Sequence, residues 1–490
     1  MINTVYELIT DVMAKQYPDR VAFRYVAADG KTVVEKTYAQ YVQDIRRAVT
    51  YFKENIPDIK GKRVGIMSRN CYEYGVNSFG AILAGAVVVT INQKKTWPEL
   101  EYELGLVEPS LIVNDGIDYG CRPDIEAAYG DKLRPMDAFK DSAPAELVDC
   151  VGHDDLIVLM FTSGTTGRSK GVMLSEKNYF TACQMYIDGL KSVLDYEERL
   201  VPQYLDQTFS HFTLVPMFHL AGFICYFVYG VQGWTLNLCC DARDLRRDMS
   251  LMHSDAMSTP PVLVEMICNE VKRGHADRLN GLWNLSCSSA ILDPAILSDL
   301  VKNGFYINQC YSMTELAGYG LLNVTQEGDH LRALGKPDGF CEVKVDETGE
   351  ICVRGGCVML GYYKNPEATA ETIDKDGWPH TGDLARVDEE GYYYMTGRKK
   401  NLIILDSGEN VSPEELEKLL GKCDAIKECI VKEMGKKIGT VVCCEDDKQQ
   451  QVKAFVTELN RTLPMYKRIS VVECSAEPLP RNALGKLLRR

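Results

Sequence analysis

The spacing of apolar residues along the first hundred or so positions predicts helices that alternate with short strands. The helical spacing covers 5–13, 38–52 and 72–83, and the β-rich runs are 63–67, 86–90 and 111–113. Such alternation is typical of βα units, so we expect an α/β fold with a largely parallel sheet. The same pattern resumes from Thr213 to about Tyr311.

The pattern changes after about His330 to short strands separated by Gly and Asp turns, as at 349–355 and 390–395. This predicts a small antiparallel or barrel-like layer over about 330–397. A charged run at 397–401 follows, and then an α+β tail with a helix from Pro413 to about Leu420. We therefore expect an N-terminal domain of residues 1–399 and a small mobile C-terminal domain of residues 400–490, with the boundary at Lys400.

Composition and charge narrow the possible partners. The chain has 490 residues, of which 46% are hydrophobic and 25% charged, enough for a large core and more than one domain. A net charge of -14 argues against binding to nucleic acid or to an anionic membrane, because either would need a basic face. The stretch between Asp206 and Asp241 lacks charged residues, but Pro216 and His219 interrupt it, and its continuous apolar run is too short to span a bilayer.

The N-terminus lacks the basic and apolar regions of a secretory signal, so we expect a cytoplasmic protein with reduced thiols. None of the 18 cysteines forms a C-x-x-C pair, and the seven histidines are not clustered at ligand spacing. A structural zinc site is therefore not expected.

A loop rich in Gly, Ser and Thr follows the apolar run Leu156–Met160 and ends near Lys170. Glycines let successive backbone N–H groups converge and hydroxyls add donors, so such a loop can bind phosphate. It does not match the Walker A pattern, because Ser169 precedes Lys170 and Gly171 follows it. A P-loop NTPase is thus disfavoured, and taken alone the loop is equally compatible with a solvated turn.

Further blocks follow the loop in order: 216–222 (PMFHLAG), 311–315 (YSMTE), 361–369 (GYYKNPEAT), 377–383 (GWPHTGD), 397–400 (GRKK), 408–415 (GENVSPEE) and 480–486 (PRNALGK). Together with MFTSGTTGRSKGV they resemble the adenylate-forming enzymes, which include acyl-CoA synthetases, aryl-CoA ligases, firefly luciferase and peptide-synthetase adenylation domains. The pattern is most similar to AMP-forming acyl-CoA ligases, and it spans nearly the whole chain.

The resemblance implies an enzyme that uses ATP and Mg²⁺ to convert a carboxylic acid into an acyl-adenylate with release of pyrophosphate. The implied nucleotide contacts are Thr162, Ser163, Gly164, Thr165, Thr166, Gly167, Lys170, Ser289, Ala290, Asn308, Gln309, Tyr311, Thr314, Asp383, Arg398 and Lys486. Glu315 is the implied Mg²⁺ ligand, since Mg²⁺ prefers oxygen. Lys486 is the implied catalytic cation between the carboxylate and the α-phosphate, with Thr314 and Glu315 assisting.

The acyl pocket is expected near 211–222, at His211, Phe212, Met217, His219 and Gly222, with His219 as a gate that takes part in catalysis. Peptide-synthetase domains usually carry an Asp in this region to pair with an amino-acid ammonium group, and 211–219 has no carboxylate. Because burying an unpaired ammonium group is costly, we expect an apolar or aromatic acid, such as a fatty or aryl acid, rather than an α-amino acid.

The expected acyl acceptor is the thiol of coenzyme A. The phosphopantetheine arm of a carrier protein is the alternative, and a nucleotide-binding protein without catalysis is a third possibility. By resemblance, Lys400 is the hinge about which the tail domain would rotate to exchange Lys486 for the Gly408 loop during thiolation. The sequence departs from the family pattern at Ser312, usually Gly, at 287–290, where a glycine-rich G-G-A-P is common, and at Asn401, usually acidic.

Overall fold

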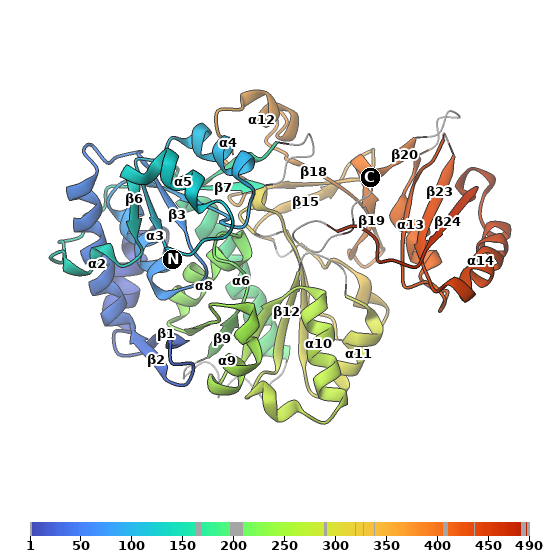
Figure 1. Ribbon diagram of the computed structural model, residues 1–490, viewed down its shortest axis with the longest axis horizontal. Helices are drawn as coiled ribbons and strands as arrows, with labels where there is room; N and C mark the ends of the chain where they lie inside the picture. Colours follow the sequence, from blue (N-terminus) through green and yellow to red (C-terminus); the bar gives the residue numbers. More distant parts are fainter. Residues whose placement is uncertain are drawn as a thin grey trace. The chain divides into compact units, whose positions relative to one another are not determined.

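The computed structural model describes residues 2–162, 168–196, 209–288, 292–318, 320–326, 328–337, 339–404, 410–435, 437–481 and 487. By its internal contacts the chain divides into two compact units (Figure 1). The larger unit contains 1–343 and 353–379, and the smaller contains 344–352 and 380–490.

The first large sheet of the larger unit has seven strands in the described residues, in the order β17-β8-β7-β4-β3-β5-β6. Its strands are β3 (Arg63–Met67), β4 (Val87–Thr90), β5 (Leu111–Asn114), β6 (Leu133–Pro135), β7 (Leu156–Thr162), β8 (Lys170–Ser175) and β17 (Gly361–Tyr362). The strands from β7 to β6 run parallel, whereas β8 is antiparallel to both β7 and β17. The accompanying helices are α2 (Tyr38–Asn55), α3 (Tyr72–Leu83), α4 (Trp97–Val107), α5 (Arg122–Tyr129) and α12 (Pro366–Thr372).

The second large sheet has eight strands in the described residues, in the order β14-β13-β12-β11-β9-β10-β1-β2. Its strands are β1 (Val21–Val26), β2 (Val33–Thr37), β9 (Ser210–Thr213), β10 (Thr235–Leu238), β11 (Ala256–Thr259), β12 (Asn284–Ser288), β13 (Tyr306–Tyr311) and β14 (Leu321–Asn323). Only the edge strands β2 and β14 pair antiparallel within this described sheet. The helices of this part are α1 (Val5–Glu7), the π-helical η1 (Leu8–Gln16), α6 (Glu176–Tyr196), α8 (Leu220–Gln232), α9 (Leu245–Leu251), α10 (Pro261–Lys272) and α11 (Pro294–Lys302).

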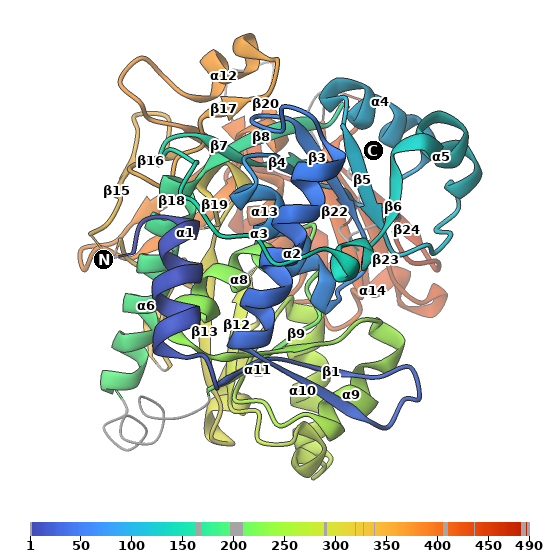
Figure 2. The same cartoon turned by 90° about the vertical axis from the view of Figure 1, so that its left-hand side faces the viewer.

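Local sequence signals explain where these helices begin and how closely they pack. Thr37 and Gln40 form a capping box at the start of α2, which satisfies backbone N–H groups that would otherwise lack a partner. Helices α2 and α3 pack side by side (Figure 2). At their contact Gly80 of α3 lies so close to Ala48 of α2 that a Cβ atom on Gly80 would be 2.4 Å from the Cβ of Ala48. A glycine is therefore required at this position for the observed packing.

The smaller unit includes most of an antiparallel layer and the tail. The layer has the order β15-β16-β18-β19, with β15 (Glu342–Val345), β16 (Glu350–Arg354), β18 (His380–Val387) and β19 (Tyr393–Arg398). The tail contains β20 (Ile403–Ile404), β21 (Asn410–Val411), β22 (Glu428–Glu433), β23 (Ile438–Cys443), β24 (Val471–Ser475), α13 (Pro413–Leu420) and α14 (Gln449–Thr462). Apolar residues of α13, α14 and the strands β22 and β23 form its own core.

The mixed α/β architecture that the sequence predicts is confirmed, including the helices at 38–55 and 72–83 and the antiparallel layer after residue 330. Internal contacts place β18 and β19 with the tail rather than with the larger unit. The hinge at Lys400, which lies in the 3₁₀ turn η8 (Lys399–Asn401) directly after β19, stays a prediction. None of the helices in the described part of the chain combines the length and apolar character needed to cross a membrane.

The α2–α3 contact provides a stability test. We expect Gly80→Ala to lower the free energy of unfolding by about 1–3 kcal/mol, because the added methyl group overpacks the contact with Ala48. Gly105→Ala in α4 is the matched control, since nothing lies within 4 Å of the Cβ it would add and alanine is the better helix former. Thermal unfolding of both variants measures the difference. Equal midpoints for Gly80→Ala and the wild type would contradict the proposed packing constraint.

Candidate nucleotide and acyl site

The loop rich in glycine and hydroxyl residues connects two paired strands. Thr162 at the end of β7 and Lys170 at the start of β8 are register partners in an antiparallel pair. The loop residues Ser163, Gly164, Thr165, Thr166 and Gly167 lie outside the described residues. The described flanks therefore place Lys170 opposite Thr162, at the ends of the two paired strands that flank this loop.

Tyr362 connects Lys170 to Glu315. The ammonium group of Lys170 lies 4.7 Å from the centroid of the Tyr362 ring, a distance at which a cation is attracted to an aromatic face. The Tyr362 hydroxyl donates a hydrogen bond of 2.9 Å to Oε1 of Glu315. Two residues far apart in the sequence, Lys170 and Glu315, thus contact the ring and the hydroxyl of one tyrosine.

The backbone holds Tyr362 in this position. Strand β17 pairs with β8 so that Tyr362 lies opposite Val172, and the N–H of Met359 donates to the carbonyl of Glu315 at 2.9 Å. Burial raises the pKa of Tyr362 well above its usual value, with the Glu315 carboxylate as a further cause, so the phenol stays a donor. We did not assign Tyr362 from the sequence, although it lies in the block GYYKNPEAT, because the motif does not indicate which of its tyrosines points toward Glu315.

Thr314 and Glu315 occupy a 3₁₀ turn, η6 (Thr314–Leu316), shortly after β13. Glu315 provides carboxylate oxygens, the ligand type that Mg²⁺ prefers, and Tyr362 fixes the orientation of one of them. The residues present therefore fit a Mg²⁺ site at Glu315. The Thr314 hydroxyl lies one residue from that carboxylate and is chemically able to donate to a phosphate oxygen.

Asp383 and Arg398 form an ion pair in the smaller unit. They are register partners on β18 and β19, and Arg398 Nε lies 2.9 Å from Asp383 Oδ1. The Asp383 side chain is largely buried, whereas that of Arg398 is 44% exposed. This geometry leaves the guanidinium group accessible to an anion, while the carboxylate can accept hydroxyl groups.

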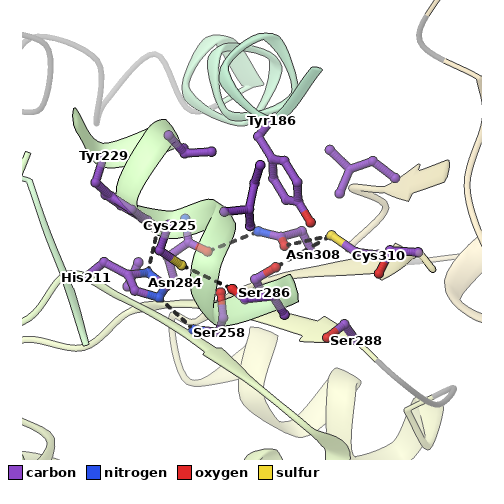
Figure 3. Close-up of a pocket in the computed structure, with 16 residues that line it drawn as sticks. Tyr186, His211, Cys225, Tyr229, Ser258, Asn284, Ser286, Ser288, Asn308 and Cys310 are labelled. Atoms are coloured by element: carbon purple, nitrogen blue, oxygen red, sulfur yellow. Dashed lines mark hydrogen bonds between the residues drawn. The ribbon is translucent and has the colours of Figure 1, made fainter. Parts of the chain in front are cut away.

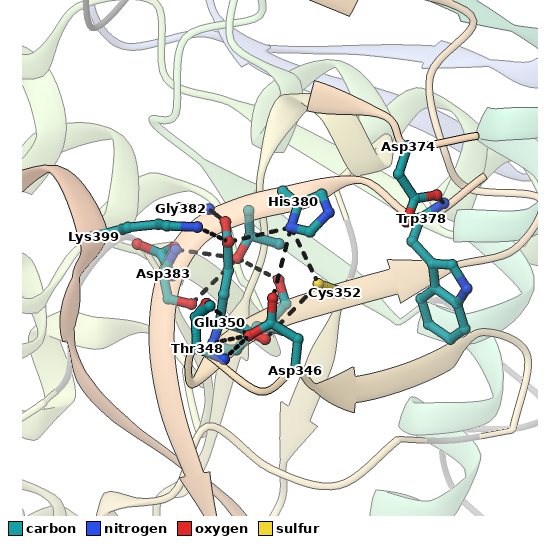
Figure 4. Close-up of polar contacts among 12 residues, drawn as sticks. Asp346, Thr348, Glu350, Cys352, Asp374, Trp378, His380, Gly382, Asp383 and Lys399 are labelled. Carbon is teal, nitrogen blue, oxygen red and sulfur yellow. Dashed lines mark hydrogen bonds and ion pairs between the residues drawn. The ribbon is translucent and has the colours of Figure 1, made fainter. Parts of the chain in front are cut away.

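A buried carboxylate, Glu350, holds the segment that carries Asp383 (Figure 4). Its Oε1 accepts from the N–H of Gly382 at 2.7 Å, and its Oε2 accepts from Lys399 Nζ at 2.8 Å. His380 Nδ1 lies 3.2 Å from the same Oε2. Because the charge of Glu350 is paired with Lys399, this network orients the start of β18 without leaving an isolated buried charge.

One group of possible metal ligands lies beside this network. Asp346, Cys352 and His380 each bring a ligand atom to within 4.8 Å of the others. The ammonium group of Lys399 already lies at 2.8 Å from the neighbouring Glu350, where it would repel a cation. We therefore interpret the group as part of the hydrogen-bonded support of Asp383.

A narrow pocket of about 60 Å³ lies in the larger unit (Figure 3). Helices α6 and α8 cover one side of it, and strands β9, β11, β12 and β13 form the other. Its lining residues are Tyr186, His211, Ala221, Ile224, Cys225, Val228, Tyr229, Ala256, Ser258, Asn284, Ser286, Ser288, Asn308, Cys310, Ser312 and Leu322. Of these residues, only His211 was expected from the sequence to line the acyl pocket.

The other residues expected in the acyl pocket do not line this cavity. Phe212 is fully buried in a core cluster that includes Leu245 and Met249, because neighbouring residues of a strand point to opposite faces. Met217 is fully buried. A Cβ on Gly222 would be 2.4 Å from the carbonyl oxygen of Pro216, so this glycine allows a close backbone contact.

His219 is exposed and caps α8, since its Nδ1 accepts from the N–H of Ala221 at 3.3 Å. Its role as a gate stays a prediction, because the described cavity does not include it.

The three residues expected near the adenine lie in different environments. Asn308 lines the cavity and donates to Asn284 Oδ1 at 3.2 Å. The Gln309 side chain is engaged by the backbone, because it donates to Leu331 O at 2.7 Å and accepts from Leu292 N. Tyr311 ends β13, just before the Thr314 turn. Adenine binding by these three residues stays a prediction.

Several other expected site residues, Ser289, Ala290, Gly408 and Lys486, lie outside the described residues. Partial burial and the neighbouring Arg398 lower the pKa of Lys400, although its side chain is not enclosed. The described part of the site thus comprises the Lys170–Tyr362–Glu315 group, the pocket, and separately the Asp383–Arg398 pair.

Comparison with known proteins identifies relatives over nearly the whole chain. The family described as AMP-binding enzyme matches residues 11–363. The 4-coumarate–CoA ligase-like 9 of Oryza sativa subsp. japonica is 28% identical over 541 residues, covering 99% of this chain and 92% of the relative. A feruloyl-CoA synthase from an Amycolatopsis species is 30% identical over 454 residues, covering 88% of each chain.

Among solved structures, the O-succinylbenzoate coenzyme A synthetase of Bacillus subtilis, in complex with ATP and a magnesium ion, superimposes with a TM-score of 0.79. It is 23% identical, and the match covers 99% of this chain and 98% of that one. At this identity the likeness supports the fold, and it confirms the predicted fold class.

The Tyr362–Glu315 hydrogen bond provides a test of the site. We expect Tyr362→Phe to weaken the binding of Mg²⁺ with ATP by about 10-fold, because a hydrogen bond to a charged group contributes about 1.5–3 kcal/mol. The phenylalanine ring keeps the contact with Lys170. Titration of ATP binding against Mg²⁺ concentration measures the change.

Tyr363→Phe is the matched control, because the described structure records no hydrogen bond of the Tyr363 hydroxyl. An equal effect of both substitutions, or no effect of Tyr362→Phe, would contradict the role of the phenol in orienting Glu315.

Proposed function

Because the chain belongs to the AMP-binding enzyme family, we propose that it activates an uncharged-tail carboxylic acid with ATP and transfers the acyl group to coenzyme A. Membership of the family confirms the resemblance seen in the sequence, and the names of the relatives agree with the expected class of AMP-forming acid-thiol ligase. The observation that carries the proposal is the Lys170–Tyr362–Glu315 group beside the glycine-rich loop.

The chemistry requires positive charge near the reacting groups. An anionic carboxylate has to approach the α-phosphate of ATP, which is itself strongly negative. Mg²⁺, held by Glu315, would supply a divalent charge to the phosphates. Lys170 adds a cation near the loop that covers the leaving pyrophosphate, and Tyr362 contacts both Lys170 and Glu315.

Two further roles are proposed from the resemblance. Asp383 accepts the ribose hydroxyls, and its pairing with Arg398 supports this role because the pair orients the carboxylate. Lys486 stabilises the negative charge that develops as the carboxylate oxygen bonds to the α-phosphorus and pyrophosphate departs. The thiol then attacks the carbonyl of the acyl-adenylate, and AMP leaves.

The lining of the pocket supports the choice of acid. Among the described lining residues there is no Asp, Glu, Lys or Arg, so neither an ammonium group nor a second carboxylate on the substrate would find a counter-ion among them. Burying such a charge unpaired is strongly unfavourable. We therefore propose an aromatic or otherwise uncharged acid rather than an α-amino acid.

Coenzyme A is the proposed acceptor, because the curated relatives described above are named as ligases or synthases of coenzyme A thioesters. Rotation of the tail about Lys400, with the Gly408 loop approaching the acyl group during thiolation, belongs to the same proposal. The phosphopantetheine arm of a carrier protein presents the same thiol. Product analysis after pyrophosphate exchange distinguishes the two acceptors.

The reaction is tested by acid-dependent exchange of pyrophosphate into ATP, followed by product analysis with coenzyme A. We expect exchange with uncharged aryl or short acyl acids, none with α-amino acids, and an acyl-CoA product. Exchange without acyl-CoA would replace coenzyme A with a carrier protein as the acceptor. No exchange with any acid in the panel, although ATP binds, would overturn the proposal in favour of a protein that binds nucleotide without catalysis.

Lys486 is tested by separating the two half-reactions. We expect Lys486→Ala to reduce pyrophosphate exchange by at least about 100-fold, and to leave thiol transfer from a supplied acyl-adenylate within a few-fold of wild type. Lys453→Ala, an exposed lysine on α14, is the control and should affect neither step. An equal loss of both half-reactions in Lys486→Ala would contradict the two-conformation scheme.

A further inference from the structure

The pocket has a polar stripe along its strands. His211 of β9 and Asn284 of β12 are both register partners of Ala256 on β11, so they lie in one row across the sheet. Ser258, Ser286 and Asn308 form the next row. From Ser288 to Asn284 the stripe covers about 13 Å, at roughly 3.3 Å per residue. The row of His211 and Asn284 is therefore the one farthest from the carboxyl ends of the strands, where Thr314 and Glu315 follow.

This polar stripe is electrically neutral. Its hydrogen-bonding groups are hydroxyls, amides and the His211 ring, and burial lowers the pKa of His211 to about 3. The imidazole is thus uncharged at any pH at which the protein would be assayed. A ligand can satisfy these groups by hydrogen bonds, but it cannot form an ion pair with them.

The hydrogen bonds of His211 determine whether the Tyr229 hydroxyl donates to His211 or accepts from it. His211 Nε2 accepts from the N–H of Ser258 at 3.3 Å, so the proton of the neutral ring must be on Nδ1. Nδ1 lies 2.6 Å from the Tyr229 hydroxyl oxygen and therefore donates to it. The Tyr229 O–H is left with a proton to donate, and the described residues provide no acceptor for it (Figure 3).

Asn284 offers a second donor at the same level. It is 2% exposed, and its Oδ1 accepts from Asn308 Nδ2 at 3.2 Å. In the described part of the chain its own amide N–H groups have no acceptor, and the residue lines the cavity. The amide can therefore donate into the cavity, where an oxygen atom of a ligand would accept.

We propose that the acid used by this protein carries a neutral oxygen acceptor at the end of its tail, bound by the Tyr229 hydroxyl and the Asn284 amide. His211 is a positioning residue, which holds the phenol so that its proton points toward the ligand. The inference rests on the proposed function and adds the chemical class of the substrate. It also narrows the expectation of an apolar acid, because a plain hydrocarbon tail would cover both donors without pairing them.

The size of the cavity agrees with a short tail. A volume of about 60 Å³ has room for only a few water-sized groups, so a long alkyl chain does not fit the pocket as it stands. A group that ends in a hydroxyl or carbonyl oxygen and occupies no more than this volume has suitable size and chemistry.

The wild-type enzyme provides the first test. Pyrophosphate exchange is measured with two matched pairs of acids: 3-(4-hydroxyphenyl)propenoic against 3-phenylpropenoic acid, and an ω-hydroxyalkanoic acid against the unsubstituted acid of equal chain length. We expect kcat/KM to favour the oxygenated member of at least one pair by about 10-fold or more. The pair that shows the preference identifies the skeleton. Equal values within both pairs, or a preference for the unsubstituted acids, would overturn the inference while leaving the proposed function intact.

The second test uses a variant. Tyr229→Phe should lower kcat/KM for the oxygenated acid by about 10-fold, mainly through KM, and leave the unsubstituted acid unchanged or improved. Tyr226→Phe is the matched control on the same helix: its buried hydroxyl does not line the cavity, and the preference should persist. Asn284→Ala is a second variant with the same expected loss. An unchanged preference in both pocket variants would overturn the assignment of the donors, whereas failure of all acids in wild type would contradict the proposed function itself.

Discussion

Tyr362 is the side chain on which the described phosphate side of the larger unit depends. It contacts a cation, Lys170, through its ring face and a carboxylate, Glu315, through its hydroxyl. Cation–π attraction and a hydrogen bond to a charged oxygen both favour a fixed geometry, so one phenol orients both charged groups. The pairing of β17 with β8 maintains this arrangement, because it places Tyr362 beside the strand that begins with Lys170.

The two parts of the candidate site in the larger unit, the Lys170–Tyr362–Glu315 group and the pocket, differ in their charge. The first concentrates charged groups, as a polyphosphate requires. The pocket that we propose for the acid has none of them among its described lining residues and offers hydroxyl and amide dipoles instead. A neutral His211 fits this pattern, because burial among apolar and amide groups makes its charged form unfavourable. Specificity for the acid then depends on which dipoles are paired, since an unpaired buried donor selects against a substrate that lacks its acceptor.

Sequence reasoning predicted the helices and parallel strands well, because amphipathic spacing and capping residues are local signals. It also identified the family, because the motifs that carry the resemblance are contiguous. It predicted the pocket poorly: only His211 and Asn308 among the lining residues had been assigned to a site, and Asn308 had been assigned to the adenine. The stripe of Asn284, Ser286 and Ser288 alternates along one strand, and this period-2 pattern of polar residues could have indicated a polar cavity face. Phe212 shows why the rest could not be predicted, since only the register across β9 and β11 decides which face of the strand meets the cavity.

The departures from the family pattern can now be placed. Ser312 and Ser288 both stand where glycine is common, and both line the pocket that we propose for the acid. Replacing a glycine by serine adds a Cβ and a hydroxyl, which narrows a cavity and makes it more polar. Asn401 lies elsewhere, where its amide donates to Glu414 Oε1 at 2.6 Å. Two of the three departures therefore lie in the lining of this pocket, while Thr314, Glu315, Asp383 and Arg398 are retained. Such a division is expected of an enzyme that keeps the chemistry of adenylation and differs in the acid it accepts.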